Sequence, residues 1–275
     1  MTETILSAVM SFGVLGLLLG AGLALAGRIF AVETDPREER ALAALPGVNC
    51  GACGFPGCGG YAHAVACAGM ELNRCPVGGA AVAAKLADIM GKEAAAFERR
   101  FARVFCNGGR AECPERFSYK GIISCQAANL VGGGGKLCTY GCLGMGSCAD
   151  ACPFDAIAMS VRGLPVVDEA KCAACGRCVL ACPRGLMRLV EESKRVIVAC
   201  SSRDRGPDTM KICKVGCIAC RLCEKNCPVK AIAVSDNLAR HDFAKCEQHQ
   251  VCVQKCPKKT IVVLPPLPRR ALSSS

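Results

Sequence analysis

Residues 172–183 read Cys-Ala-Ala-Cys-Gly-Arg-Cys-Val-Leu-Ala-Cys-Pro, and residues 217–228 read Cys-Ile-Ala-Cys-Arg-Leu-Cys-Glu-Lys-Asn-Cys-Pro. Both stretches have the spacing C-x2-C-x2-C-x3-C-P, which holds [4Fe-4S] clusters in pairs, with the fourth cysteine serving the neighbouring cluster. Three fixed spacings and a proline seldom arise together by chance. The sequence therefore predicts iron–sulfur sites, and each block requires a second block as its partner.

Two further cysteine blocks supply these partners. One is Cys138-x3-Cys142-x5-Cys148-x3-Cys152-Pro153, a looser variant that indicates additional loop residues. The other keeps the spacing over residues 246–257 but has a histidine at the second ligand position. Because three adjacent thiolates cover one face of a cube and the fourth reaches the neighbour, the spacing predicts four ligand sets. The sets are Cys138, Cys142, Cys148 and Cys182; Cys172, Cys175, Cys178 and Cys152; Cys217, Cys220, Cys223 and Cys256; and Cys246, Cys252 and Cys227 with His249.

The role of His249 stays open at this point. If it binds iron, the loss of one thiolate's negative charge should raise the potential of that cluster, as it does in Rieske centres. If it is only a polar surface residue, the site holds a [3Fe-4S] cluster or none.

A fifth site is predicted nearer the N-terminus. Cys50, Cys53, Cys58 and Cys75 stand in a glycine-rich segment, whose backbone can wrap closely around sulfur. Zinc also accepts four thiolates at such spacing, so zinc is the alternative for this block. Six cysteines remain, and a sixth cluster is one interpretation of four of them. Those four are Cys106, Cys125, Cys200 and Cys213; burial as small apolar side chains is the other interpretation, and Cys67 and Cys113 fit no pattern.

The first thirty residues predict a membrane anchor. Ile5 to Ala26 contains no charge and is long enough to cross a bilayer as one helix. Basic residues follow this stretch and none precedes it, so the positive-inside rule places the rest of the chain on the cytoplasmic side of the plasma (inner) membrane. Disulfides rarely persist there, which favours metal ligation for the 25 cysteines.

The expected fold is α+β, in five segments. They are a single-pass transmembrane anchor (1–31), a small helical Gly/Cys-rich [4Fe-4S] domain with a helical cover reaching Phe105 (32–105), two tandem bacterial-ferredoxin-like βαβ-repeat domains (106–199 and 200–264) and a disordered tail (265–275). Repetition of the Cys-Pro exits, each followed by an apolar strand-like stretch, supports the tandem units.

Charge and motifs exclude several functions. The formal net charge is +11, but about five clusters carrying about −2 each would cancel most of it, so nucleic-acid binding is not expected. No dinucleotide motif occurs in a strand-to-helix context, and no phosphate-cradling loop is present. The chain should therefore have no nicotinamide or flavin site of its own and should perform one-electron chemistry.

The order of the segments resembles a known family. An N-terminal anchor, the block Cys50-Gly-Ala-Cys53-Gly-Phe-Pro-Gly-Cys58 and tandem ferredoxin units are together similar to the B subunits of the Rnf complexes, the ion-translocating ferredoxin:NAD oxidoreductases. The resemblance implies an electron-transfer subunit of a translocase. It would take electrons from soluble ferredoxin and pass them to membrane and flavin-bearing subunits. Two alternatives stay open: an iron–sulfur subunit of another membrane-bound dehydrogenase or reductase, and a zinc-stabilised cysteine-rich interaction protein.

Overall fold

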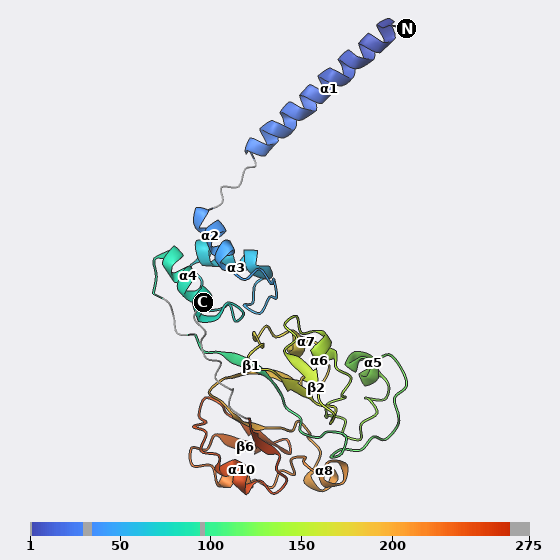
Figure 1. Cartoon of the computed structure of the whole chain (residues 1–275), viewed down its shortest axis with the longest axis vertical. Coiled ribbons are helices and arrows are strands. Elements are labelled where there is room, and N and C mark those ends of the chain that lie inside the picture. The colour runs from blue at the N-terminus through green and yellow to red at the C-terminus, as the bar shows by residue number, and fades with distance from the viewer. Residues whose placement is uncertain (1, 30–34, 94–96, 265–275) are drawn as a thin grey trace.

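The computed structural model describes residues 2–29, 35–93 and 97–264, and Figure 1 shows their arrangement. A long N-terminal helix is followed by a small helical lobe and then by a larger body of short strands and short helices. The chain is therefore a mixed helix and strand protein with one N-terminal apolar helix. The tail predicted to be disordered lies outside the described residues.

The N-terminal helix α1 (Thr2–Ile29) extends beyond the expected span at both ends. Its segment Val9–Ile29 has the length and composition of a membrane span, and none of that segment is buried inside the protein. Phe12, Leu17 and Leu23 are all more than 70% exposed. A helix with apolar side chains on all sides and no protein partner needs another apolar environment.

The helical lobe consists of α2 (Pro36–Ala44), α3 (Gly57–Ala68) and α4 (Gly79–Met90). These helices pack around the fully buried side chains of Tyr61 and Leu86. The Tyr61 hydroxyl donates to the carbonyl oxygen of Glu71 at 2.8 Å and accepts from the backbone N–H of Arg74 at 3.3 Å. This residue therefore fixes the loop that carries Cys75, and its burial raises the pKa of Tyr61 to about 12.

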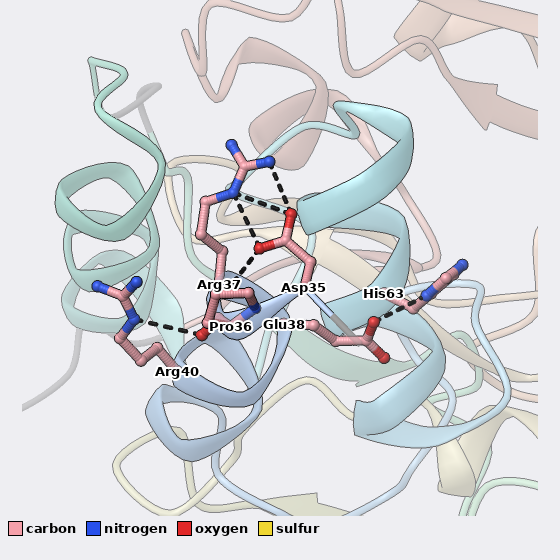
Figure 2. A network of polar contacts seen from close by, with 6 residues as sticks. All are labelled: Asp35, Pro36, Arg37, Glu38, Arg40 and His63. Atoms are coloured by element: carbon pink, nitrogen blue, oxygen red, sulfur yellow. Dashed lines mark hydrogen bonds and ion pairs between the residues drawn. The ribbon is translucent and has the colours of Figure 1, made fainter. Parts of the chain in front are cut away.

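Helix α2 begins at a well-formed N-cap, shown in Figure 2. The Asp35 carboxylate accepts from the Arg37 backbone N–H at 2.8 Å and forms an ion pair with the Arg37 guanidinium, which holds the pKa of Asp35 below its usual value. One turn later, Glu38 contacts His63 of α3 at 2.9 Å. These contacts set the start of α2 and its position beside α3.

The helical cover predicted as far as Phe105 ends much earlier. Helix α4 stops at Met90, and Arg100–Val104 forms strand β1 instead. Phe101 and Ala102 of this strand are fully buried, and the guanidinium of Arg99 lies 5.0 Å from the centre of the Phe101 ring. Pairing with a distant strand decides the conformation, because local propensity is weaker than backbone hydrogen bonding and burial.

The strands of the described residues pair two by two, and all pairs are antiparallel. The first group nests β2–β3 inside β1–β4, and the second nests β6–β7 inside β5–β8. The remaining strands are β2 (Ile157–Met159), β3 (Pro165–Val167), β4 (Met187–Glu191), β5 (Val196–Val198), β6 (Ile232–Ser235), β7 (Leu238–His241) and β8 (Ile261–Val263). The registers run from Arg100↔Glu191 to Val104↔Met187 in one outer pair and from Val196↔Val263 to Val198↔Ile261 in the other.

Short helices lie between these strands. They are α5 (Cys125–Leu130), α6 (Ser147–Asp150), α7 (Arg177–Leu180), α8 (Gly206–Ile212), α9 (Leu222–Lys225) and α10 (Val251–Lys255). Helices α6, α7, α9 and α10 occupy the same place in the four cysteine blocks, around the third cysteine of each motif.

Strand pairing places the boundaries between the segments earlier in the chain than the sequence predicts. β1 falls within the predicted domain 32–105 but pairs with β4, and β5 falls within 106–199 but pairs with β8. A strand belongs with the partner that satisfies its backbone groups. The two strand groups meet where Phe105, Val190 and Ile197 pack together.

A buried ion network ties the two groups at the same place. The Glu169 carboxylate contacts Arg103 of β1 and lies 2.8 Å from the Arg195 guanidinium, which directly precedes β5. The Glu169 and Arg103 side chains are 9% and 5% exposed. Removing a buried carboxylate that lies between two guanidinium groups destabilises a fold, chiefly because the positive charges are then left uncompensated.

We expect Glu169→Gln to destabilise the protein by about 3–5 kcal/mol. In a chain of this size this corresponds to a fall in Tm on the order of 10 °C, measured by anaerobic scanning calorimetry at a fixed rate. Glu192→Gln is the matched control, since Glu192 lies 3.9 Å from Arg195 and is 38% exposed. Equal shifts for both variants would contradict the role given to Glu169.

Candidate metal centres

The Cys-Pro cysteines that end the four ferredoxin-type blocks share one backbone contact. The Sγ atoms of Cys152, Cys182, Cys227 and Cys256 each accept a hydrogen bond from the backbone N–H four residues later, at 3.4, 3.3, 3.2 and 3.3 Å. An N–H group directed at sulfur stabilises a thiolate and the cluster that it binds. The turn after each Cys-Pro therefore prepares that sulfur as a ligand.

The loops that carry the first three positions of each block also share one conformation. The residues on both sides of the second position have positive φ: Ala174 and Gly176, Ala219 and Arg221, Gln248 and Gln250, and Gly144 and Gly146. A left-handed non-glycine residue costs about 1–2 kcal/mol. Such strain persists where the surrounding structure requires it, and here it turns the chain around a shared cavity.

Two of the predicted ligand sets each line one cavity. Cys217, Cys220, Cys223 and Cys256 surround about 360 Å³ of open space. Cys50, Cys53, Cys58 and Cys75 surround about 300 Å³, where the Gly78 backbone N–H donates to Cys75 Sγ at 3.4 Å. The structure thus brings together all four members of each set.

The set of Cys152, Cys172, Cys175 and Cys178 also comes together. Cys178 is buried, and Cys152 and Cys172 pack in the same apolar cluster. Burial raises the pKa of Cys178 to about 12, with repulsion from Cys172, Cys175 and Cys152 adding to the effect. Burial likewise raises the pKa of Cys175, and Cys50 of the helical lobe is close enough to contribute.

The last set has three thiols and two histidines. Cys227, Cys246 and Cys252 line a cavity of about 300 Å³ together with His249 and His241. The His249 side chain is 44% exposed, and its Nε2 atom lies 3.6 Å from Glu247. His241 lies with Nε2 3.7 Å from Cys246 Sγ, and its burial lowers the pKa of His241 to about 4. Sequence spacing carried no signal for His241, because it comes from β7 rather than from the cysteine block.

The remaining set differs from the prediction at one position. Cys142, Cys148 and Cys182 line a cavity of about 360 Å³ with Cys125, while Cys138 lines a different cavity. The loop also contains no extra residues: Gly144 and Gly146 have the φ values of 76° and 86° that mark the second ligand position in the other blocks, and Met145 stands between them. The true spacing is therefore Cys142-x2-Met145-x2-Cys148-x3-Cys152, which the sequence could have revealed.

Helix α5 brings Cys125 to this cavity. The Cys125 backbone N–H donates to the Ser147 hydroxyl at 2.8 Å, and the Gln126 side chain donates to the Ala181 carbonyl oxygen at 2.8 Å. Burial raises the pKa of Cys148 to about 11, and Cys125 is the first neighbouring thiol that adds to the effect. Cys125 thus lies where the thiol absent at Met145 would be needed.

These donor sets fit iron–sulfur cubes. Each combines closely spaced thiols with a backbone N–H group directed at sulfur, and four of the five also surround open space, which are features that such clusters require. Cys67 lies apart from these sets, exposed on α3, with its Sγ within 4.8 Å of donor atoms of Glu38 and His63.

Comparison with known proteins agrees with this chemistry. Residues 45–77 match the family model described as a putative Fe-S cluster, and residues 171–231 match that of a 4Fe-4S dicluster domain. The chain is 46% identical over 255 residues to the B subunit of the Na(+)-translocating ferredoxin:NAD(+) oxidoreductase complex of Acetobacterium woodii, a match that covers 93% of this chain and 77% of that protein. It is 40% identical over 253 residues to the B subunit of the ion-translocating oxidoreductase complex of Methanosarcina acetivorans, covering 92% and 96% of the two chains.

This chain belongs to the B subunits of the Rnf complexes. A third relative, the B subunit of the proton-translocating ferredoxin:NAD(+) oxidoreductase complex of Clostridium ljungdahlii, is 41% identical over 245 residues, covering 89% and 86% of the two chains. The resemblance seen in the sequence is thereby confirmed, and the zinc interpretation is set aside. Like its relatives in this family, the chain is an iron–sulfur electron-transfer subunit of a multi-subunit ion-translocating oxidoreductase complex.

The placement of Cys125 makes a rescue experiment possible. We expect Cys125→Ser to reduce the iron content by about four atoms per chain, because one cube loses a ligand. Adding Met145→Cys should restore the iron, since the loop already has the backbone of Cys175 and Cys220. Iron and sulfide analysis after anaerobic purification measures both effects, and the exposed Cys67→Ser is the control. Failure of Met145→Cys to restore any iron would contradict the assignment.

The position of His249 generates a second prediction. We expect His249→Cys to lower the potential of one cluster, on the order of 100 mV, because a thiolate adds negative charge to the site. Redox titration followed by electron paramagnetic resonance measures the change, with the exposed His63→Cys as control. Identical titrations for wild type and His249→Cys would show that His249 does not bind iron.

Proposed function

We propose that this subunit accepts single electrons from soluble reduced ferredoxin and relays them through five [4Fe-4S] clusters to the other subunits of the complex. The clusters are held in the helical lobe and in two tandem ferredoxin-like units, on the cytoplasmic side of a plasma membrane that α1 crosses once. Nicotinamide and flavin chemistry and ion transport then belong to partner subunits.

The observation that carries this proposal is the order of the thiol sets along the fold. Cys50, in the lobe that follows α1, is close enough to Cys175 to affect its pKa. Cys178 in turn adds to the raised pKa of Cys148. These three sets are therefore neighbours, which supports transfer of an electron between them one cluster at a time.

Residues of this chain favour electron transfer between the clusters. When bound, [4Fe-4S] clusters take up and release one electron each. Backbone N–H groups directed at sulfur favour the reduced state by offsetting its charge, and burial excludes water from the sulfurs. The two antiparallel strand pairs of each group then hold neighbouring thiol sets at fixed positions.

The distribution of charged residues supports both the cytoplasmic orientation of the chain and ferredoxin as the electron donor. Arg28 lies in the last turn of α1, and Arg37 and Arg40 follow the helix, which favours a cytoplasmic location for the remainder. Residues 211–275 contain twelve Lys or Arg against four Asp or Glu, more than two clusters would offset. Such an excess would attract an acidic electron donor.

Three lysines mark the point where this donor would dock. Lys255 and Lys259 are exposed, and Lys258 lines the same cavity as Cys256. A positive group at the rim of a ligand set can hold an acidic protein close to the cluster behind it. The names of the relatives from A. woodii and C. ljungdahlii include ferredoxin, which supports this choice of donor.

Iron and acid-labile sulfide analysis tests the cofactor. The anaerobically purified chain should be brown, with at least about twenty irons and as many sulfides. A folded, colourless chain with four or five zinc ions would reject the proposal.

Reversing the charges of Lys255, Lys258 and Lys259 to Glu should slow reduction by ferredoxin roughly tenfold or more at low salt, and much less at high salt, because steering is screened. Stopped-flow absorbance measures the rate. Lys85→Glu with Lys92→Glu is the matched control, since these exposed lysines lie in the helical lobe. Equal rates at every ionic strength would exclude this docking site.

A further inference from the structure

A cavity of about 400 Å³ lies among thiols that the five ligand sets leave unused. It is lined by Cys106, Cys113, Cys138, Cys200 and Cys213. The cavities lined by four of the other thiol sets measure about 300 to 360 Å³, so this one offers at least as much space. All of these thiols except Cys200 are buried, and Cys200 is half-buried.

Four of the five thiols are related by the internal repeat. Cys106 follows the end of β1 by two residues, and Cys200 follows the end of β5 by two residues. Cys138 and Cys213 each begin a C-x2-G-C sequence that leads into the next block. Cys113 has no such counterpart, because the equivalent position after Cys200 is Pro207. Each strand group thus contributes two thiols to one cavity.

The backbone contacts repeat in the same way. The Cys142 N–H donates to Cys106 Sγ at 3.4 Å, and the Cys217 N–H donates to Cys200 Sγ at 3.4 Å. Cys200 Sγ also accepts from the Ser202 N–H at 3.4 Å. As in the Cys-Pro turns, backbone N–H groups are directed at sulfur, although from other positions in the chain, and they indicate sulfurs prepared to carry negative charge.

A buried cation completes the environment. Lys136 is 8% exposed and lines this cavity, where its ammonium group donates to the carbonyl oxygens of Gly108 at 2.5 Å and Cys142 at 2.9 Å. Within the described ranges no carboxylate pairs with it. A buried ammonium requires negative charge nearby, and four thiolates binding iron would supply it. Gly108 also leaves room for sulfur, since a Cβ there would lie only 3.0 Å from Cys213 Sγ.

We propose that Cys106, Cys138, Cys200 and Cys213 hold a sixth [4Fe-4S] cluster between the two strand groups. This set replaces the sequence-based one, in which Cys125 took the place of Cys138. Cys113 is a fifth thiol at the wall of the same site and not a ligand.

The sixth site would join the two halves of the relay, and in this respect it rests on the proposed function. Cys142 belongs to one neighbouring thiol set and Cys217 to the other, and their N–H groups contact Cys106 and Cys200 directly. Each transfer through the site moves one electron, which oxidises the cluster behind it and reduces the cluster ahead.

Native mass spectrometry of the detergent-solubilised, anaerobically purified full chain tests the count. We expect six clusters in the wild type and five in Cys106→Ser/Cys200→Ser, with a loss of about four irons. Cys113→Ser is the matched control and should keep all six. If the double variant does not fold, the wild-type count and the single variant Cys138→Ser decide in its place.

Five clusters in the wild type would overturn the sixth site while leaving the relay proposal standing. An iron-free wild type would instead reject the relay itself. Loss of a cluster in Cys113→Ser, with none lost in Cys138→Ser, would overturn the ligand set.

Discussion

Burial of many thiols close together is the condition on which this structure depends. Burial raises the pKa of Cys142, Cys178 and Cys223 to about 12 each, and nearby thiols add to the effect. Buried thiolates repel one another unless positive charge lies among them. In this family of proteins, the iron of the clusters supplies that charge. The chain has no tryptophan and only three tyrosines, so clusters take over part of the work of an aromatic core.

One backbone conformation surrounds different residues at the second position of the blocks. Ala174 and Gly176 surround Cys175 with the same positive φ that Gln248 and Gln250 place around His249, and that two glycines place around Met145. A thiol from outside the block can therefore lie beside such a loop, as Cys125 of α5 does in the cavity of Cys142, Cys148 and Cys182.

The positive charge of the chain has two different roles. Lys136 is buried against carbonyl oxygens beside a group of thiols, and burial lowers the pKa of Arg184, which hydrogen-bonds carbonyl oxygens of the loop containing Cys138 and Gly141. These groups compensate charge inside the fold. Lys255 and Lys259 are exposed and can act on a partner. Net charge alone cannot separate the two roles, because it ignores burial.

The family, the apolar helix, the chemistry of the cysteines and the grouping of the closely spaced ones could all be predicted from the residues alone. Such ligands lie on one loop, so local geometry brings them together. The three-dimensional fold was needed to show that Arg100–Val104 is a strand, that Cys125 lines the cavity of Cys142, and that Cys138 shares a cavity with Cys106, Cys200 and Cys213. These outcomes depend on pairing between β1 and β4 and between β5 and β8, contacts across long stretches of chain that no local spacing encodes.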